Sequence, residues 1–413
     1  MVTPWGPLGI PDLAGHPRAV RWVGHTARAV NLGLLNLEGA RDADEALTLA
    51  ASLGIPAQNI LVADRKGTIG WTLAGPIPRR QGSDGRLPSV SPRPGRWVGW
   101  LEPEDYPRIL APADHRLWTA NNRVVAGEAL ALLGDGGLEL GARAGQIRQG
   151  LTARDSFDEA GLLAIQLDYR AQFLARWRRL LLDTLGSETL VGHPQRAALR
   201  RVVAAGAKRA AVDDAGYRLV REFRAAVLAR ILEPVIQVVQ AQGDGREPYR
   251  ERLVQLEGAL WQLVSHRPHH WLAPAYADWQ ALLLAAVDNV AAAVTRSTPD
   301  VADYTWGRHN TLAMAHPLSL VLPSLGDWLN MPPVPLPGDI HMPRVQRPGA
   351  GASVRLVVAP GREEQALCHM PGGQSGHPLS PFYRLGHAAW AAGEATPLLP
   401  GPAQHRLVLN PGS

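Results

Sequence analysis

Two adjacent amide side chains are the clearest candidates for chemistry, in the segment Thr119-Ala120-Asn121-Asn122-Arg123. The segment follows a strand-like run over 116–118, which could hold a side-chain N–H at a fixed place. A fixed N–H donor stabilises the oxyanion that forms when a carbonyl carbon is attacked. An asparagine pair is also typical of a turn, and the local sequence taken alone favours that interpretation. Both interpretations stay open on these residues.

Two other segments contain residue types found in active sites, but their spacing does not fit. The cluster His266-Arg267-Pro268-His269-His270 has the ligand types of a zinc site, yet its proline breaks helical spacing and favours a solvated loop. In residues 372–378, Gly376 follows Ser375 directly, which differs from the Gly-x-Ser-x-Gly pattern of a serine nucleophile. We find no Walker loop, dinucleotide-binding fingerprint or helical His-Glu-x-x-His motif.

The composition is that of a folded globular protein and excludes several classes. Of 413 residues, 46% are hydrophobic and 19% are charged, which argues against disorder. We expect no membrane association, because no apolar run approaches the roughly 18 residues of a membrane-spanning helix. A lone cysteine, Cys368, excludes an internal disulfide framework and a multi-cysteine metal site.

The net charge of +5 does not by itself indicate a nucleic-acid partner. It arises from 42 basic and 37 acidic residues, and the basic residues are scattered along the chain. The densest group, Arg176-Trp177-Arg178-Arg179, lies within a helical pattern, where the polar face of an ordinary helix is expected. We therefore expect no nucleic-acid binding.

The spacing of apolar residues predicts a helical middle between two ends that are rich in short strands. The turn Asp64-Arg65-Lys66-Gly67 separates two apolar runs and predicts a β-hairpin, preceded by a helix over 43–53. Loops with short strands are expected over 75–118, and short strands over 353–358 and 365–368. Long amphipathic helices are expected over 155–185, 197–211, 217–242, 249–264 and 276–296. We interpret residues 1–413 as one domain, with a mainly helical insert over about 150–297 between β-rich ends at 1–149 and 298–413.

Eight short motifs occur in the same order as in one known family. They are Gln58-Asn59 with Ala63-Asp64 and Gly67-Thr68-Ile69-Gly70-Trp71; Gly75-Pro76-Ile77-Pro78-Arg79; Trp97-Val98-Gly99-Trp100; Ala120-Asn121-Asn122; Trp306-Gly307-Arg308 with His316-Pro317-Leu318; Gly338-Asp339; Gly351-Ala352-Ser353-Val354-Arg355; and Gly372-Gly373-Gln374-Ser375-Gly376. Each motif is weak alone. Together they resemble the C-terminal three quarters of the β chain of the penicillin acylase (penicillin amidase) family of N-terminal-nucleophile hydrolases.

The resemblance implies a fold and a reaction. The fold is α+β, the four-layer αββα arrangement of N-terminal-nucleophile hydrolases, here expected to be incomplete at its N-terminal side. The reaction is hydrolysis of a non-peptide carbon–nitrogen bond, which releases an acyl group from a β-lactam, an acyl-homoserine lactone or a similar N-acyl amide. In the family, an N-terminal serine is the nucleophile, and its own α-amine, with a pKa near roughly 8, is the general base.

The resemblance also assigns roles to two residues of this chain. Asn121 resembles the family's oxyanion-binding asparagine, with Asn122 as the alternative if the register shifts by one residue. Arg143, in Arg143-Ala144-Gly145-Gln146-Ile147, matches the family's Arg-x-x-x-Ile arginine, which organises the asparagine and the base. The motifs identify no substrate-binding residues.

The resemblance begins at Thr3-Pro4-Trp5-Gly6-Pro7, where the family has a strand with histidine at the position of Trp5. The nucleophilic serine is therefore expected to be absent, and we predict that the chain alone is inactive. A complementary α chain and an N-terminal β-chain fragment are the expected partners, and a small N-acyl amide is the expected substrate. The alternative is a non-catalytic, truncated remnant or a binding protein that retains the fold.

No cofactor or metal is expected. Gly85 falls at the position of one backbone ligand of the family's calcium site, but calcium needs six to eight oxygen ligands. The N-terminus has neither a basic head nor an apolar run, so the chain as encoded is expected to be cytoplasmic, although family members are usually periplasmic or secreted.

Overall fold

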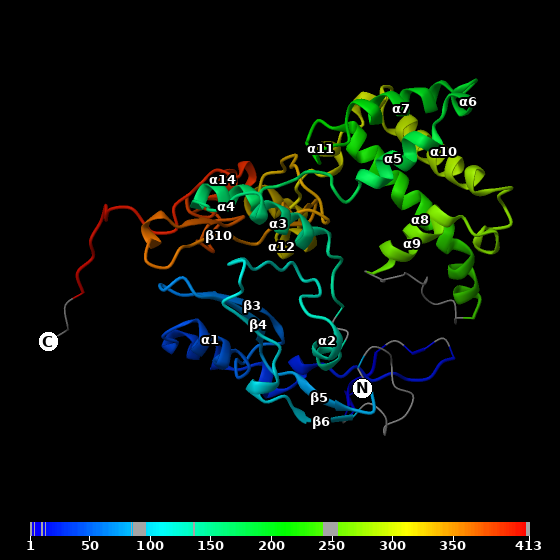
Figure 1. Ribbon diagram of the computed structural model, residues 1–413. Helices are drawn as coiled ribbons and strands as arrows, with labels where there is room; N and C mark the ends of the chain where they lie inside the picture. Colours follow the sequence, from blue (N-terminus) through cyan, green and yellow to red (C-terminus); the bar gives the residue numbers. More distant parts are fainter. Residues whose placement is uncertain are drawn as a thin grey trace.

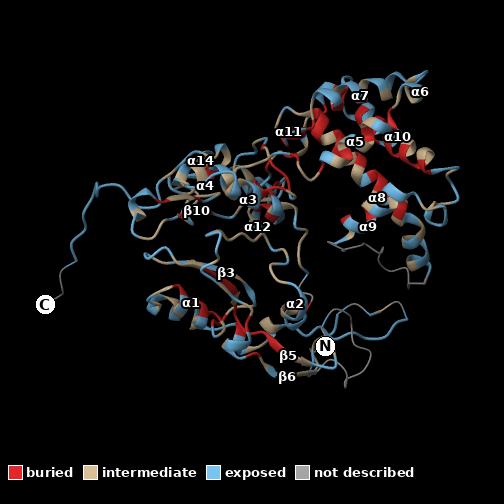
Figure 2. Ribbon diagram, in the orientation of Figure 1, coloured by how far each residue is buried: buried red, intermediate tan, exposed pale blue. Residues whose placement is uncertain are grey.

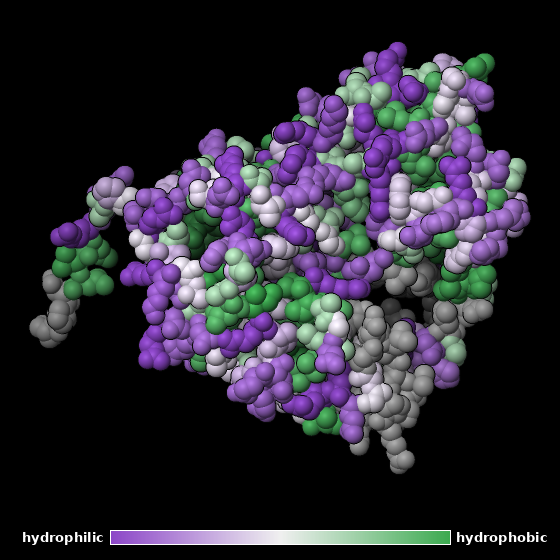
Figure 3. Space-filling view, in the orientation of Figure 1, coloured by the Kyte–Doolittle hydropathy of each residue, from purple (hydrophilic) through white to green (hydrophobic). Residues whose placement is uncertain are grey.

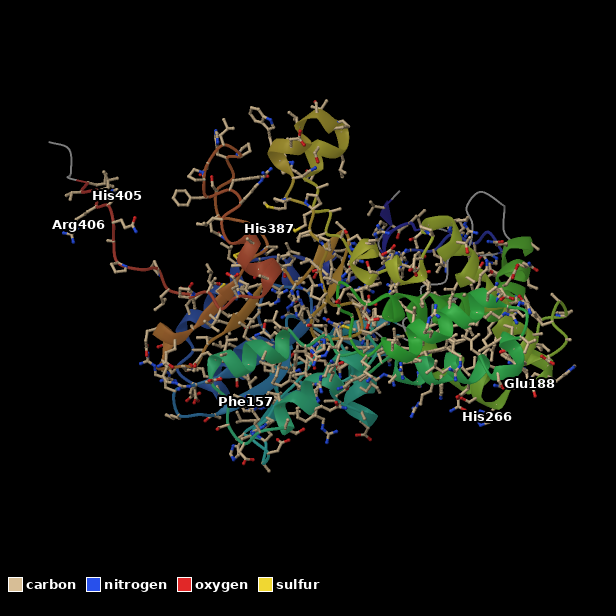
Figure 4. All side chains as sticks on the ribbon, turned by 90° about the horizontal axis from the view of Figure 1, so that it is seen from above. Phe157, Glu188, His266, His387, His405 and Arg406 are labelled. Carbon is tan, nitrogen blue, oxygen red and sulfur yellow. The ribbon has the colours of Figure 1, made fainter. Side chains whose placement is uncertain are left out.

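The structure is a computed structural model that describes residues 2–3, 5–9, 11–12, 14–83, 85, 96–134, 137–242 and 255–409. A helical bundle, green to yellow in Figure 1, lies at one end of the molecule, and the C-terminal elements lie toward the other end. Figure 4, a view from above, shows the same separation: Glu188 and His266 belong to the bundle and His387 to the C-terminal part. Strands and helices therefore gather in different regions of the chain.

The predicted hairpin is confirmed and forms part of a sheet in the order β3-β4-β7. Strand β3 spans Gln58–Ala63, β4 spans Ile69–Ala74 and β7 spans Ile109–Leu110, and neighbouring strands are antiparallel. The turn forms because Asp64 Oδ1 accepts hydrogen bonds from the backbone N–H groups of Lys66 (2.9 Å) and Thr68 (3.0 Å). Gly67 completes the turn at a φ of 83°, which favours glycine.

Helix α1, Ala43–Ala50, covers this sheet and agrees with the helix predicted over 43–53. Asp42 caps it by accepting a hydrogen bond from Glu45 N at 3.0 Å. Its buried face includes Leu47, which lies so close to Gly70 of β4 that a Cβ there would be 2.6 Å from Leu47 Cδ1. A larger residue at position 70 would therefore require the Leu47 side chain to shift.

A second hairpin lies beside the first. Strand β5, Pro78–Gln81, pairs with β6, Arg96–Trp100, in antiparallel fashion. The buried hydroxyl of Tyr106 holds the segment that leads into β5, because it donates to Gly75 O (2.8 Å) and accepts from Ile77 N (3.0 Å). The strand-like run expected over 116–118 is not a strand, so that expectation was wrong. The Arg116 guanidinium donates to the carbonyls of Leu151, Arg154 and Asp155.

The helical bundle contains the largest buried core among the described residues. Its main helices are α5 (Ala175–Thr184), α7 (Pro194–Ala205), α8 (Ala215–Gln242), α9 (Leu256–His266) and α10 (Trp279–Ser297). Trp177, Phe223 and Leu282 are fully buried between them. Figure 2 shows buried residues in red on α5, α8 and α10. The amphipathic patterns over 197–211, 217–242 and 276–296 are thus confirmed as helices, with shifted ends.

The single helix predicted over 155–185 is two helices, α4 (Glu159–Gln166) and α5. Between them, Asp168 accepts hydrogen bonds from the backbone and side chain of Arg170, which competes with helical hydrogen bonding. Ala171 N also donates to Lys208 O at 2.9 Å, and Arg170 forms an isolated bridge with Arg209. A distant segment therefore breaks the helix. For the helix predicted over 249–264, residues 249–254 lie outside the described part of the chain.

The strands predicted near the C-terminus are confirmed in shorter form. Strand β10, Arg355–Val357, pairs with β11, Leu367–His369. Helix α14, His387–Ala392, is linked to β10 because Arg355 Nη1 donates to Trp390 O at 2.8 Å. Gln166 at the end of α4 donates to Leu356 O at 3.0 Å, which joins this unit to the middle of the chain.

The remaining elements are short. The strands are β1 (Val2–Thr3), β2 (Gly6–Pro7), β8 (Gln346–Arg347) and β9 (Ala350–Gly351), and the helices are α2 (Gly127–Leu133), α3 (Ala142–Thr152), α6 (Ser187–Leu190), α11 (Trp306–His309), α12 (Pro317–Val321) and α13 (Gly326–Leu329). Within the described residues, no sheet has more than three strands. None of the helices in that part of the chain is long and apolar enough to cross a membrane. Figure 3 shows hydrophobic patches interspersed with hydrophilic surface on one face.

Candidate active site

Asn121 and Arg143, the two residues selected from the sequence, lie in contact. Asn121 is in the turn that follows the 116–119 segment, and Arg143 is in the first turn of α3. Arg143 Nη2 donates a hydrogen bond to Asn121 Oδ1 at 3.0 Å. Because the guanidinium occupies the oxygen of the amide, the NH2 group of Asn121 is directed away from Arg143. An orientation of this kind leaves that NH2 group available as a donor.

The backbone of Asn121 has an uncommon conformation and is also hydrogen-bonded. Its φ of 63° lies in the left-handed region, which asparagine tolerates better than most residues. Glu139 N donates to Asn121 O at 2.8 Å, so the turn is tied to the segment just before α3. Residues in sparsely populated backbone conformations occur often at functional sites. Glu139 was not predicted from the sequence.

Arg143 is half-buried, and its electrostatic surroundings are mixed. Burial lowers the pKa of its guanidinium below the ordinary value, and the nearby Glu139 carboxylate acts in the opposite direction. An arginine whose pKa is lowered in this way still stays protonated at neutral pH. The side chain therefore presents a permanent positive charge next to the amide of Asn121.

Asn122, the alternative candidate, uses its amide within its own turn. Its Oδ1 accepts from Ala120 N at 2.9 Å, and its Nδ2 donates to Arg123 O at 2.7 Å. These local bonds are typical of an asparagine that stabilises a turn. The structure thus gives Asn121 and Asn122 different surroundings, and Arg143 contacts the former.

Helix α3 is fixed to the turn at both of its ends. At its start, Arg143 bonds Asn121; near its end, Arg116 Nε donates to Leu151 O at 2.8 Å. The Arg116 guanidinium also lies 5.9 Å from the ring centre of Phe157, which is labelled in Figure 4. Within this segment, Thr119 Oγ1 is buried and has no hydrogen-bond partner among the described residues. These contacts set the position of α3 relative to the Asn121 turn.

A cleft of about 420 Å³ lies on another side of α3. Ala142, Gly145, Gln146 and Gln149 line it from α3, and they share one helix face at the expected spacing. Asn121 and Arg143 are not among its described lining residues. The cleft is therefore next to the Asn121–Arg143 pair and does not contain it.

The described residues do not provide a calcium site around Gly85. Gly85 has a φ of 77° and donates its N–H to Ser83 Oγ at 3.0 Å. Its loop neighbours, Asp84 and residues 86–88, lie outside the described residues. Nowhere in the described ranges do three or more histidine, cysteine or acidic side chains gather in a way that could hold a metal ion.

Comparisons with known proteins agree on one family. The sequence matches the family model described as Penicillin amidase over residues 1–406. It is 25% identical to the acyl-homoserine lactone acylase QuiP of Pseudomonas aeruginosa, over 93% of this chain and 49% of that protein. It is 26% identical to the penicillin acylase 2 proenzyme of Pseudomonas sp. strain SE83, over 89% of this chain and 47% of that protein. The chain spans about half the length of these curated relatives.

A solved structure shows the same fold. The thermostable penicillin G acylase of Alcaligenes faecalis superimposes with a TM-score of 0.61 at 17% sequence identity, and the match covers 100% of this chain and 78% of that one. At this identity the likeness is evidence for fold alone. It confirms the predicted α+β class and the N-terminal-nucleophile hydrolase fold.

Proposed function

We propose, because the chain belongs to the penicillin amidase family, that it supplies the oxyanion-binding part of an amide hydrolase. The reaction is hydrolysis of a non-peptide carbon–nitrogen bond in an N-acyl amide. The names of the two relatives support penicillins and acyl-homoserine lactones as substrate classes. The observation that carries the proposal is the 3.0 Å hydrogen bond between Arg143 Nη2 and Asn121 Oδ1.

In the proposed mechanism, Asn121 and Arg143 have different roles. Attack on the substrate's carbonyl carbon converts the carbonyl oxygen to an oxyanion, and Asn121 Nδ2 donates a hydrogen bond to it. Arg143 is a positioning residue, because it holds the oxygen of the same amide. Its charge also polarises the amide, which strengthens the Asn121 N–H as a donor. The barrier is lowered because the donor is oriented before the reaction begins.

The nucleophile in this proposal is the serine that the family resemblance implies, carried by the part of the relatives' length that this chain does not match. The serine hydroxyl oxygen bonds to the acyl carbon, the carbon–nitrogen bond breaks, and the serine's α-amine transfers the hydroxyl proton to the departing amine. Water then attacks the acyl-enzyme and releases the acid. In this proposal, activity requires the serine-bearing segment, and the family's α chain and N-terminal part of the β chain complete the site.

Exposed apolar side chains support the need for such a partner. Leu32 is 80% exposed, Leu320 is 73% exposed and Val321 is 77% exposed. Large exposed apolar patches mark surfaces that contact other protein segments. These exposed side chains come from both β-rich parts of the sequence, 1–149 and 298–413. The proposed partner therefore packs against more than one region of this polypeptide.

The test is hydrolysis by the chain co-expressed with a complementary half, taken from its own locus or from the penicillin acylase relative. The assembled protein should release the acid from a penicillin or an acyl-homoserine lactone, and the chain alone should not. In the assembled protein, Asn121→Ala should lower kcat by about 100- to 1,000-fold, because one oxyanion donor is lost.

Asn122→Ala is the matched control, since it removes the same amide one residue away and should change kcat by only a few fold. Equal losses in the two variants would contradict the assignment of Asn121. Substrate binding by the assembled protein without any turnover would contradict the proposed hydrolase and support a non-catalytic binding protein.

A further inference from the structure

A groove of about 500 Å³ lies at the start of α5, and Asn121 and Arg143 are not among its described lining residues. Five of its nine lining residues are cationic, and no carboxylate is among the described residues that line it. The cations are Arg170, Arg178, Arg179, Lys208 and Arg209, and the other lining residues are Ala171, Gln172, Ala175 and Ala207. Small side chains thus form a floor that is surrounded by positive charge. Its volume lies within the usual range of small-molecule sites.

The groove is built by backbone contacts between two segments that are distant in sequence. Ala171 N donates to Lys208 O and Ala210 N donates to Tyr169 O, both at 2.9 Å. The 207–209 side is fixed by the carboxylate of Asp214, which accepts from Ala207 N at 2.9 Å. Ala207 itself has a φ of 63°, a conformation that non-glycine residues rarely adopt. The cationic side chains therefore project from a fixed frame.

The charges in the groove are incompletely compensated. Arg170 is paired with Asp168 through a 2.6 Å contact. Arg178 donates to backbone carbonyls at the end of α7, including Ala204 O at 2.7 Å, and these carry no full negative charge. The guanidinium of Arg209 lies over the ring of Tyr169, 5.6 Å from its centre.

Arg179 and Lys208 complete the set. Both side chains are exposed, and neither forms an ion pair with a described residue. Within the described residues, the five cations thus have one carboxylate partner, that of Asp168. An oxyanion in this groove would meet several donors without displacing an existing ion pair.

The groove continues into the cleft beside α3. Gln172, Ala175 and Arg179 line both of them. The cleft adds the amide of Gln149, which is a hydrogen-bond donor; the buried Gln146 already donates its amide to Arg170 O, and Arg176 is already paired with the buried Glu257. Arg179 therefore lies where the two hollows meet, between donors on either side. A ligand with anionic groups at two or more positions would contact both.

We propose that this groove binds a small molecule that carries two or more oxyanion groups, carboxylates or phosphates, with Arg179 and Lys208 as its main contacts. Guanidinium groups bind carboxylates and phosphates with two parallel hydrogen bonds, whereas an ammonium group acts as a point charge. The apolar floor and the limited volume favour a compact ligand over an extended polyanion. The site is separate from the proposed amide hydrolysis and does not depend on it.

The experiment is isothermal titration calorimetry of the full chain at low ionic strength, with citrate and pyrophosphate as separate probes. We expect saturable binding of at least one probe at one site, weakened by added salt. A preference for citrate would assign carboxylates, and a preference for pyrophosphate would assign phosphates. Absence of saturable binding of both probes would overturn the proposal.

Substitutions locate the site. Arg179→Gln and Lys208→Gln should each weaken binding by about fivefold or more, since each removes an exposed cation. Arg201→Gln is the matched control, because Arg201 is exposed on α7 and does not line the groove. An equal loss in the Arg201 variant would show that only general charge attracts the probe and would overturn the site. Thermal unfolding of each variant verifies that it is folded, and the readout requires no hydrolytic activity.

Discussion

At the scale of single residues, Asn121 and Asn122 have the same type and adjacent positions but different contacts. The carbonyl oxygen of the Asn121 side chain accepts from Arg143, whereas the amide of Asn122 bonds to Ala120 and Arg123 within the turn. The first arrangement orients an NH2 group by means of a neighbouring charge, and the second stabilises a loop. Contacts, and not residue type, distinguish a proposed donor from a turn residue here.

The sequence could predict the two members of this pair but not their contact. Asn121 and Arg143 were selected through motifs that resemble a known family, and a separation of 22 residues carries no distance information. Glu139 could not be predicted, because it holds Asn121 through a backbone N–H. Every residue except proline has that group, so no residue type reveals it.

A half-buried histidine sets a pH dependence of stability. Burial lowers the pKa of His341 from 6.5 to about 4, and Arg224 acts in the same direction. Between these two values the unfolded chain binds a proton that the folded chain does not, so the folded state loses stability as pH falls through this window. We expect this residue to remove up to about 3 kcal/mol from the free energy of unfolding.

Urea unfolding at pH 7 and pH 5 measures this effect. His341→Gln, which cannot titrate, should lose less stability between the two pH values than the parent chain. His405→Gln changes an exposed histidine near the C-terminus and should behave like the parent. An identical pH dependence in the parent and His341→Gln would show that the histidine is not the cause.

At the scale of elements, the local sequence was sufficient to predict an element whose contacts are local. The hairpin β3–β4 was predicted because Asp64 and Gly67 form its turn within four residues. The break between α4 and α5 was missed because leucines continue at helical spacing through it. Backbone bonds from 169 and 171 to the 208–210 segment cause that break, and no local pattern reports them.

The buried carboxylate of Glu257 joins three helices of the bundle, α5, α8 and α9. Glu257 is 4% exposed and accepts from Trp177 Nε1 and Arg224 Nε, both at 2.8 Å, and from Arg176. Glu257→Gln would keep the shape but leave two guanidinium groups without their counter-charge. We expect a loss of about 3 kcal/mol in the free energy of unfolding of the bundle, as for other broken buried ion pairs.

Urea denaturation of the full chain, followed by tryptophan fluorescence, provides the measurement. Glu188→Gln is the control, since Glu188 is exposed on α6 and should change stability by a few tenths of a kcal/mol at most. A change in Glu257→Gln no larger than that of the control would exclude this ion network as a source of bundle stability.

At the scale of the whole molecule, the bundle and the strand-rich parts differ in how complete their cores are. The bundle buries thirty residues in one cluster, whereas the other two clusters bury three each within the described residues. The sheets there have two or three strands, and small sheets need further packing for stability. The sequence could predict the α+β class, but the cores depend on long-range packing that no motif encodes.

This difference predicts that the bundle and the strand-rich parts have different free energies of unfolding. The chain by itself should associate or unfold in more than one step, because its strand-rich parts present apolar surface. Size-exclusion chromatography with light scattering and urea unfolding should show this. Co-expression with the proposed complementary half should give a defined complex and a single transition. A monomer that unfolds cooperatively without any partner would contradict the proposed partner.

The coupling between Asn121 and Arg143 tests the central claim most directly. The measurement is a double-mutant cycle on kcat in the assembled protein, with Asn121→Ala, Arg143→Ala and the double variant. If Arg143 acts by positioning Asn121, the double variant should hydrolyse substrate no more slowly than Asn121→Ala alone. If the two losses instead multiply in the double variant, the residues act independently, and Arg143 does not hold the oxyanion donor.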